Sequence, residues 1–308
     1  MSEPVGWADV PVTVRVPATS ANLGPGFDAL GLALTLHDVI EARIIPGRVA
    51  IEVSGAGEDT AAAGEDHLII RAMRAAFDAA GGQPPGIGLR CANAIPHGYG
   101  LGSSAGAIVA GLLAARALSA DGAGLTDADV LRLATRLEGH PDNVAACLAG
   151  GLTIAWTSDS GARAARLDLV AGLTPVLCVP GIPLSTTRAR GLLPPTVPHA
   201  DAAANAARAA LLVAGLTADP ALLMAGTEDF LHQPYRARAM PATADLIGRL
   251  RAAGIPAVVS GAGPAVLALA VAGTHPGPEA VQKIAGGTGD AWRVQSLDVD
   301  TDGATIQA

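Results

Sequence analysis

The sequence predicts an α/β protein built from two domains. Its 308 residues exceed what one core normally needs and suit two domains of about 100–200 residues each. Alternating apolar residues, typical of strands, interleave along the chain with apolar residues at helical spacing. The chain is 50% hydrophobic but only 3% aromatic, so we expect layers of closely packed aliphatic side chains.

The acidic balance of the chain argues against a nucleic-acid partner. The formal net charge is −8, from 28 acidic and 20 basic residues, and no basic run occurs, whereas a phosphate backbone requires clustered Lys and Arg. Lys283 is the single lysine, so it is the one candidate for lysine chemistry such as a Schiff base or a Walker-type phosphate contact. Its neighbours indicate a solvated helix face.

The cysteines and the apolar runs predict a cytoplasmic protein with no membrane partner. Cys91, Cys147 and Cys178 are odd in number, widely spaced and without CxxC spacing, which favours neither a disulfide framework nor a zinc site. The first ten residues lack the features of a signal peptide, and no apolar run approaches the ~18 residues that a membrane span needs.

The first elements are a strand, a long polar loop and a second strand. Valines alternate over residues 12–16, and we expect Pro17 to end this strand. A turn-rich stretch continues through Asp28, and a second apolar run begins at Ala29. Long irregular loops inside compact domains are more often functional than not, so this loop is a candidate part of the site.

A glycine-rich stretch, PHGYGLGSSAG at residues 96–106, follows a predicted helix at 65–80 and a predicted strand at 87–91. An alanine-rich helix follows it, with Ser103 and Ser104 where an N-cap and a first turn belong. This order predicts an anion site at a helix N-terminus. Alternatively, the glycines only permit positive φ in a tight connection. Neither a Walker lysine nor a third dinucleotide glycine is present, so the helix dipole, open amides and a metal must supply the positive charge.

A polar cluster follows the next predicted helix, which begins after Thr126 and ends at Gly139. Glu138 lies at the C-terminal end of this helix, where the macrodipole disfavours a carboxylate unless a cation or a metal compensates it. His140, Asp142 and Asn143 come next, at the start of a further short helix. These polar residues also fit an ordinary capped helix junction, so both interpretations stay open.

The second half changes composition around residues 157–169, where we expect the domain boundary. A strand over residues 174–180 precedes a short helix on which Thr186 and Arg190, four residues apart, share a face. Arg236 and Arg238 lie near a proline-bounded turn, and either fits an ordinary surface cation. Two further strands flank a second glycine turn, Gly261 to Pro264.

Three of these segments together resemble the GHMP family of small-molecule kinases. PATSANLGPGFDALGLAL resembles the substrate motif of the family, PHGYGLGSSAG its nucleotide loop and SGAGPAVLAL its C-terminal glycine motif, in the expected order over residues 12–270. EGHPDNVAACLAGG and STTRARGLLP resemble the homoserine kinase branch. Two departures are Tyr99, where that branch usually carries Arg, and Gly-Ala-Gly-Pro in place of Gly-Ser-Gly-Pro.

The resemblance implies a GHMP kinase fold, an α/β fold of the two-layer α+β type. Residues 1–165 would form an N-terminal domain like ribosomal protein S5 domain 2, with a left-handed crossover, and residues 166–308 a ferredoxin-like C-terminal domain. The site would lie between them. The implied reaction converts ATP and L-homoserine into ADP and O-phospho-L-homoserine, a step towards threonine, in a homodimer.

The resemblance also assigns the site residues. Ser104 and Glu138 would bind Mg²⁺, a cation that prefers hard oxygen ligands. The nucleotide loop would comprise Pro96, His97, Gly98, Tyr99, Gly100, Leu101, Gly102, Ser103, Ser104, Ala105 and Gly106. The substrate residues would be Asn22 and Asp28 for the ammonium group, Arg190 and Arg236 for the carboxylate or the transferring phosphoryl group, His140, Asn143 and Thr186 on the hydroxyl side, and Gly263.

The catalytic residues implied are Asn143, Arg190 and Asp142. Asp142 is the candidate base by analogy with other GHMP kinases, whereas homoserine kinases are thought to rely on positioning. A loose phosphoryl-transfer transition state asks little of a base, so we favour positioning. The alternatives are a GHMP kinase for mevalonate-type or sugar substrates, and a non-catalytic protein of this fold.

Overall fold

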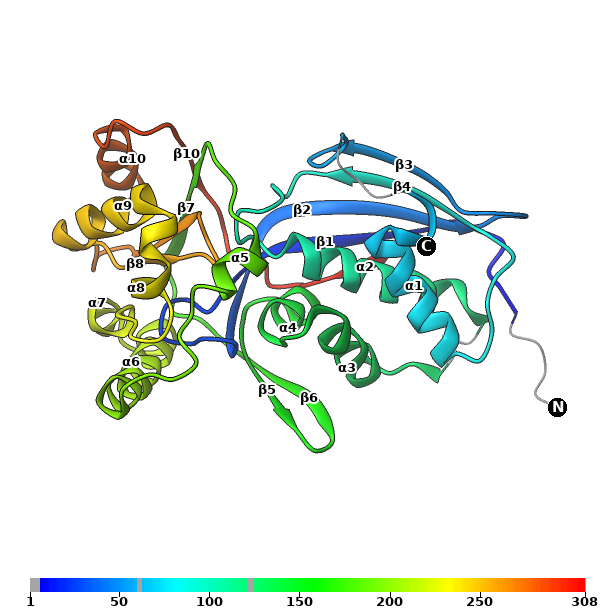
Figure 1. Cartoon of the computed structure of the whole chain (residues 1–308), viewed down its shortest axis with the longest axis horizontal. Coiled ribbons are helices and arrows are strands. Elements are labelled where there is room, and N and C mark those ends of the chain that lie inside the picture. The colour runs from blue at the N-terminus through cyan, green and yellow to red at the C-terminus, as the bar shows by residue number, and fades with distance from the viewer. Residues whose placement is uncertain (1–5, 60–62, 121–123, 308) are drawn as a thin grey trace.

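The computed structural model describes residues 6–59, 63–120 and 124–307, which form two units side by side, each with its own sheet (Figure 1). The first sheet runs β11–β1–β2–β4–β3, with β5 paired to another part of β2 and β6 paired to β5. Its strands are β1 (Val12–Ala21), β2 (Leu30–Ile44), β3 (Ala50–Gly55), β4 (Ile87–Asn93), β5 (Leu152–Ser158), β6 (Gly161–Leu167) and β11 (Thr305–Gln307).

Four helices cover one face of the first sheet (Figure 1). They are α1 (Leu68–Ala79), preceded by a 3-10 turn at Gly64–Asp66, α2 (Ser103–Leu118), α3 (Asp127–Glu138) and α4 (Asp142–Ala149). Helix α2 is buried on most sides because it lies between β1 and the other helices, which explains its small and apolar sequence. The side chains of α1, such as Met73 and Phe77, complete this core.

The sequence predicted that strand β1 ends at Pro17, but the strand continues to Ala21. The register with β2 shifts between Pro17, which faces His37, and Ala18, which faces Leu34. A proline has no N–H to give to a ladder, and such irregularities are where strands tolerate it. Since β11 pairs only with Thr13–Arg15, the prolyl residue interrupts no ladder on the other side of β1 either.

The second sheet runs β10–β7–β9–β8 with antiparallel neighbours throughout. The elements of this unit follow one another as strand, helices, strand, strand, helix and strand, which is the ferredoxin-like pattern that the family resemblance implied. The strands are β7 (Leu173–Pro180), β8 (Ala257–Val259), β9 (Val266–Val271) and β10 (Trp292–Ser296). The helices are α5 (Thr186–Arg190), α6 (His199–Thr217), α7 (Leu223–Gly226), α8 (Gln233–Arg236), α9 (Pro241–Ala252) and α10 (Pro278–Gly286), with 3-10 turns at Pro220–Leu222 and Ala237–Ala239.

A continuous apolar core joins the two units. One side of the second sheet packs on α9 and α10 through side chains such as Leu246 and Val281. Leu177 and Leu269 of this sheet belong instead to a cluster that includes Leu32 of β2 and Leu152 of β5. Because this shared core is apolar, the units are held in a fixed relation.

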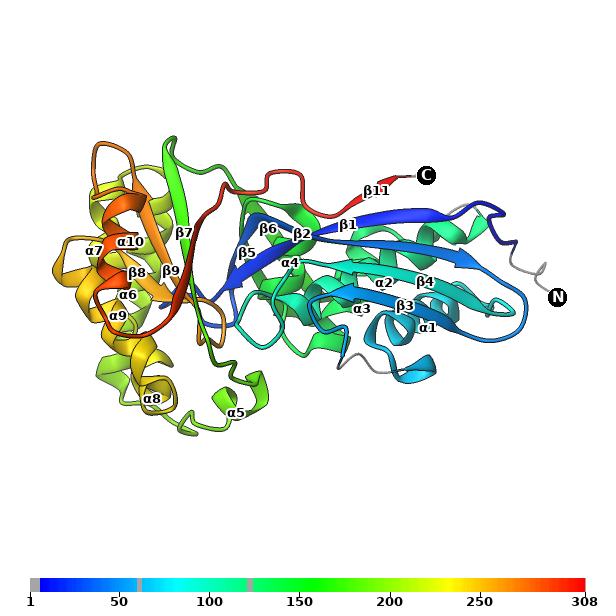
Figure 2. The ribbon, with the colours of Figure 1, turned by 90° about the horizontal axis from the view of Figure 1, so that it is seen from above.

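The chain crosses between the units more than once. The first sheet extends to Leu167 in β6, and the second begins at Leu173 in β7. After β10 the chain returns along the first sheet and ends the described part as β11 beside β1, as Figure 2 shows. The division at residues 165 and 166 stays a prediction. Among the helices described, none combines the length and apolarity that crossing a bilayer needs.

Candidate active site

A cavity of about 410 Å³ lies where the two units meet, a volume that suits a small-molecule site. Its wall combines the loop after β1, the glycine loop, the start of α2 and the α3–α4 junction with α5, α8 and the second glycine turn. The structure brings these predicted residues to the wall: Asn22, Asp28, Pro96, His97, Gly98, Gly100, Leu101, Gly102, Ser103, Ser104, Glu138, His140, Asp142, Asn143, Thr186, Arg190 and Arg236.

The glycine loop ends in an open helix N-terminus. Gly102 is the N-cap of α2, with a left-handed φ of 69°, so Ser103 is already the first helical residue and the serines do not cap the helix. The N–H groups of the first turn have no partner within a helix, and the macrodipole adds partial positive charge there. Helix α2 therefore begins one residue earlier than expected, and the anion site at its N-terminus stays a prediction.

The glycines of this loop are also required by contacts within the protein. A Cβ on Gly100 would lie 2.0 Å from the Ser260 carbonyl oxygen, and one on Gly102 would lie 1.9 Å from Thr19 Oγ1. Both glycines have positive φ. The side chain of Ser260 additionally donates to the Gly100 carbonyl at 2.7 Å. The loop is thus held between β1 and the second glycine turn. This close packing requires glycines in the loop independently of any ligand.

Ser104 and Glu138 meet at the end of the cavity formed by the glycine loop and the start of α2. Ser104 Oγ donates to Glu138 Oε2 at 2.7 Å. Burial raises the pKa of Glu138, and the Ser104 hydrogen bond opposes this only in part. The carboxylate ends α3, just before the left-handed C-cap Gly139. A hydroxyl and a desolvated carboxylate at a helix C-terminus form a donor set that fits Mg²⁺.

The α3–α4 junction is an ordered hydrogen-bonded group. Asp142 Oδ1 accepts from His140 Nδ1 at 2.6 Å and from the Asn143 N–H at 2.8 Å. Asp142 is 1% exposed. Burial alone would lower the pKa of His140, but the hydrogen bond and charge of Asp142, with the charge of Glu138, raise it overall. Thr19 Oγ1 donates to Asn143 Oδ1 at 2.7 Å, which fixes the amide orientation.

Two arginines form the other end of the cavity. Arg190 makes a two-pronged ion pair with Asp28, at 2.8 and 3.1 Å, which raises the pKa of Arg190. Arg236 is buried and makes no ion pair among residues 6–59, 63–120 and 124–307. Burial, with the like charge of Arg190, lowers the pKa of Arg236 to about 10. Both guanidinium carbons lie 5.7 Å from the centre of the Phe27 ring.

Asn22 positions the loop that carries Asp28. Its Nδ2 donates to the Gly261 carbonyl at 2.9 Å, and its Oδ1 accepts from the Asp28 N–H at 2.9 Å. Asn22, Leu23 and Asp28 all have positive φ. Such backbone conformations are costly for non-glycine residues and persist only where the surroundings enforce them. Asn22 therefore supports Asp28, and its amide is already engaged by the protein.

Four predicted site residues do not line the cavity. Tyr99 packs against the shared apolar cluster, while Ala105 and Gly106 are buried in α2. A Cβ on Gly263 would point at Met240 Sδ, 2.6 Å away, and the neighbouring Gly261 and Ala262 form the wall instead.

Sequence reasoning missed a further set of lining residues. Asp38 is the clearest, because a carboxylate within the apolar strand β2 is a visible signal. Asp38 Oδ1 accepts from the N–H groups of Ala94 and Ile95, just before the glycine loop, and burial raises its pKa. The others lie on several elements and are Ile40, Asp66, His67, Leu68, Ile69, Asn93, Ala107, Gly261 and Ala262.

The fold and the cavity, together with two family matches, define an enzyme class: the kinases of small molecules. Residues 67–151 match the family described as GHMP kinases N terminal domain, and residues 200–286 match GHMP kinases C terminal. The chain is 55% identical to the homoserine kinase of Streptomyces coelicolor over 96% of this chain and 94% of that protein.

Two further relatives agree. The homoserine kinase of Clavibacter michiganensis subsp. michiganensis is 49% identical over 96% of this chain and 94% of its own length. A crystal structure of homoserine kinase from Cytophaga hutchinsonii matches with a TM-score of 0.84 and 28% identity, covering 100% of this chain and 99% of that one. The chain belongs to the GHMP kinase family and, within it, to the homoserine kinases, so the predicted fold is confirmed.

Proposed function

We propose that the protein transfers the terminal phosphoryl group of ATP to the side-chain hydroxyl of L-homoserine, giving ADP and O-phospho-L-homoserine for threonine synthesis. The observation that carries the proposal is one cavity with an open helix N-terminus at one end and Asp28 with two arginines at the other. Its family uses ATP, and the curated relatives named above are homoserine kinases.

The charged end suits a zwitterion. The Asp28 carboxylate would accept the substrate ammonium, and Arg190 and Arg236 would bind its carboxylate or the transferring phosphoryl group. When homoserine separates Asp28 from Arg190, each side chain exchanges one opposite charge for another, so neither is left without an opposite charge. A neutral sugar offers neither charge, and mevalonate offers a carboxylate for the arginines but no ammonium for Asp28, which favours an amino acid over both.

The nucleotide end would hold ATP at the backbone N–H groups of residues 96–106. Ser104 and Glu138 would hold Mg²⁺, which supplies, when bound, the positive charge that this lysine-free loop lacks. Desolvation makes the Glu138 carboxylate costly to ionise alone, and a cation held by this carboxylate would relieve that cost.

For the transfer itself we propose positioning by the chain. Asp142 Oδ1 already accepts two hydrogen bonds, so this carboxylate holds His140 and the start of α4. Asn143, oriented by Thr19, would lie beside the acceptor hydroxyl with His140 and Thr186, and Arg190 would stabilise charge on the phosphoryl group. In a loose transition state the hydroxyl proton need not leave early.

The decisive experiment measures ADP release with homoserine, mevalonate and galactose, using wild type and Ser104→Ala over a range of Mg²⁺ concentrations. We expect turnover with homoserine alone and a variant that requires more Mg²⁺. Turnover with mevalonate or galactose instead would reverse the substrate assignment. A variant equal to wild type at every Mg²⁺ concentration would remove Ser104 from the metal site. Failure to bind Mg·ATP in titration calorimetry would indicate a non-catalytic protein.

We also propose that the protein is a homodimer, as is usual for the family. Light scattering of the purified protein tests this directly, because a dimer has twice the molar mass of the 30.5 kDa chain and a monomer would contradict the proposal. Cytoplasmic localisation stays a prediction from the sequence.

A further inference from the structure

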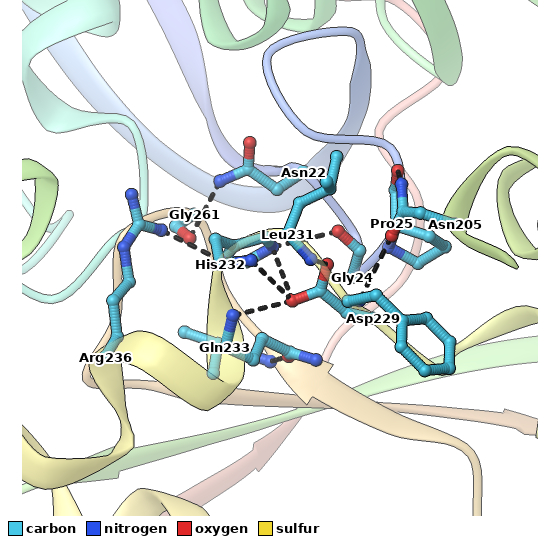
Figure 3. Close-up of polar contacts among 12 residues, drawn as sticks. Asn22, Gly24, Pro25, Asn205, Asp229, Leu231, His232, Gln233, Arg236 and Gly261 are labelled. Carbon is cyan, nitrogen blue, oxygen red and sulfur yellow. Dashed lines mark hydrogen bonds and ion pairs between the residues drawn. The ribbon is translucent and has the colours of Figure 1, made fainter. Parts of the chain in front are cut away.

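A buried polar network joins α8 to the loop between β1 and β2, as Figure 3 shows. At its centre lies His232, which is 0% exposed and outside the cavity wall. Its two ring nitrogens contact opposite sides: Nδ1 lies 3.0 Å from Arg236 NH1, and Nε2 lies 2.9 Å from the carbonyl oxygen of Gly24. One side chain therefore touches both the arginine of the second unit and the loop of the first.

The partners determine the tautomer of His232. A guanidinium can only donate, so Nδ1 must accept and the ring proton resides on Nε2, from which it is donated to Gly24. Burial lowers the pKa of His232, against the opposing charge of Asp229. The charged groups that face the ring are Asp229, whose Oδ2 is 3.5 Å from Nε2, Arg236 and the more distant Asp28. The imidazole is consequently neutral.

Asp229 fixes the turn from which His232 projects. Its carboxylate accepts from the backbone N–H groups of Leu231, His232 and Gln233, at 2.9, 3.1 and 2.6 Å (Figure 3). Three such hydrogen bonds hold the entry to α8 in one conformation and satisfy this carboxylate. Asp229 therefore orients the histidine backbone, while its charge stays on the far side of the ring from Arg236.

A neutral partner leaves the charge of Arg236 available. Arg190 is neutralised by Asp28, whereas the hydrogen bonds of Arg236 within the described residues go to the Ala189 carbonyl, through Nε at 3.2 Å, and to the neutral His232. Within the described chain these contacts engage two of its five N–H donors. A carboxylate in place of His232 would neutralise the guanidinium, whereas an imidazole orients it and leaves its charge for an anionic group in the cavity.

The other nitrogen of His232 holds the loop that carries Asp28. Gly24 approaches the second unit so closely that a Cβ would lie 3.0 Å from Val258 Cγ1. The next carbonyl, that of Pro25, accepts from Asn205 Nδ2 at 2.8 Å, so two consecutive carbonyls are held by side chains of the second unit (Figure 3). These hydrogen bonds hold the strained loop in a fixed position relative to α8.

We propose that His232 is a positioning residue that holds Arg236 and the Asp28 loop in one fixed geometry and so sets the affinity for the charged end of the amino-acid substrate. The inference rests on the proposed function, because its kinetic readout is the KM for homoserine. The two hydrogen bonds are separable: an asparagine keeps an acceptor near Nδ1, a glutamine keeps a donor near Nε2, and a leucine keeps neither.

The experiment compares His232→Asn, His232→Gln and His232→Leu in the full chain. We expect the KM for homoserine to rise about 10-fold or more in His232→Leu and by less in the other two, with the KM for ATP within about 2-fold of wild type. An unchanged KM for homoserine in a folded His232→Leu would overturn the proposal. If that variant does not fold, unchanged values in both other variants would do the same.

A second histidine, His37, is half-buried and provides the control. His37 accepts from Arg15 NH2 at 3.0 Å and contacts Asp300 Oδ2 at 2.6 Å, so its ring also joins an arginine to an oxygen acceptor, away from the cavity wall. His37→Gln should lower the melting temperature and leave the KM for homoserine unchanged. An equal rise in KM would show a general effect of destabilisation and refute a specific role of His232.

An NMR measurement separates failure of this inference from failure of the proposed function. The ¹⁵N shifts of the His232 imidazole in the wild-type protein should show the tautomer protonated at Nε2, whatever the substrate is. A charged ring, or the tautomer protonated at Nδ1, would overturn the positioning role even if homoserine is the substrate. Absence of turnover with homoserine, with the expected tautomer present, would instead reject the substrate assignment.

Discussion

The two ends of the cavity, which we propose bind the nucleotide and the acceptor, differ in the groups that they offer to a charged ligand. The nucleotide end uses main-chain groups, a helix terminus and a hydroxyl–carboxylate pair. The acceptor end uses full side-chain charges, with Arg190 and Asp28 paired and Arg236 held by a neutral histidine. A loop packed too closely for charged side chains would obtain its positive charge from the helix and the proposed metal, whereas fixed side-chain charges suit a small zwitterion. Substitutions at the two ends should therefore affect different kinetic constants.

The strongest test of the nucleotide end is Glu138→Gln. The substitution keeps the shape but removes the charge that would hold Mg²⁺. Changes around a metal site cost about 10–100-fold even when they spare the ligands, so we expect kcat to fall by at least about 100-fold, with KM for homoserine little changed. Steady-state kinetics over a range of Mg²⁺ concentrations measure this. The exposed Glu279 provides the control Glu279→Gln, and equal Mg²⁺ dependence in the two variants would contradict the assignment.

Arg236→Met tests the acceptor end. Methionine keeps the aliphatic stem and removes the charge, and each charge-assisted hydrogen bond contributes about 1.5–3 kcal/mol, so kcat/KM for homoserine should fall by about 10–150-fold. The KM for ATP should stay close to the wild-type value. The exposed Arg238, two residues away, gives the control Arg238→Met, which should behave as wild type. A larger change in KM for ATP than for homoserine would contradict the assignment of Arg236 to the acceptor end of the cavity.

Asp142→Asn tests whether Asp142 acts as a general base in phosphoryl transfer or only positions neighbouring residues. Asparagine keeps an oxygen that can accept from the Asn143 N–H but cannot take a proton from the acceptor. We expect less than the ~10²- to 10⁴-fold loss typical of removing a general base. Single-turnover phosphoryl transfer gives the rate, and circular dichroism verifies folding. A loss above about 1,000-fold in a folded variant would favour Asp142 as the base.

His140 should produce the smallest effect, one on stability. Because the folded protein raises the pKa of His140, its contribution is fully present below the unfolded pKa of about 6.5 and is lost as pH rises through the folded value. His140→Gln should thus lower the free energy of unfolding by about 1 kcal/mol near pH ~6 and by less near pH ~9, as measured in urea. In His275, burial lowers the pKa, so His275→Gln should show the opposite trend. Equal trends would refute the assignment.

Local patterns predicted most of the elements and the motifs that surround the cavity. The alternating valines of β1, the alanine-rich α2 and the Thr126-capped α3 all appear as expected, because each depends on near neighbours in the chain. The irregular pairing that lets β1 pass Pro17 could not be predicted, since it depends on a partner strand that contributes unmatched residues.

The roles of individual site residues were harder to predict for the same reason. In the sequence, Arg236 and Arg238 lie near one turn and either fits a surface cation. Only the packing of the folded chain buries Arg236 and exposes Arg238. Thr19 and Asp38 act through hydrogen bonds to residues far along the chain, Asn143 and the backbone at Ala94 and Ile95. Long-range contacts of this kind leave no periodic signal in a single sequence.

The return of the chain to the first sheet has a consequence for biosynthesis. Strand β11 covers the edge of β1, and Asp300 binds His37 and the Gly303 N–H on the way there. A ribosome releases β1 first and β11 after nearly all of the intervening chain, so the nascent N-terminal unit carries an uncovered strand edge throughout translation. Removing residues 297–307 would make that transient state permanent, and the truncated chains should self-associate through β1.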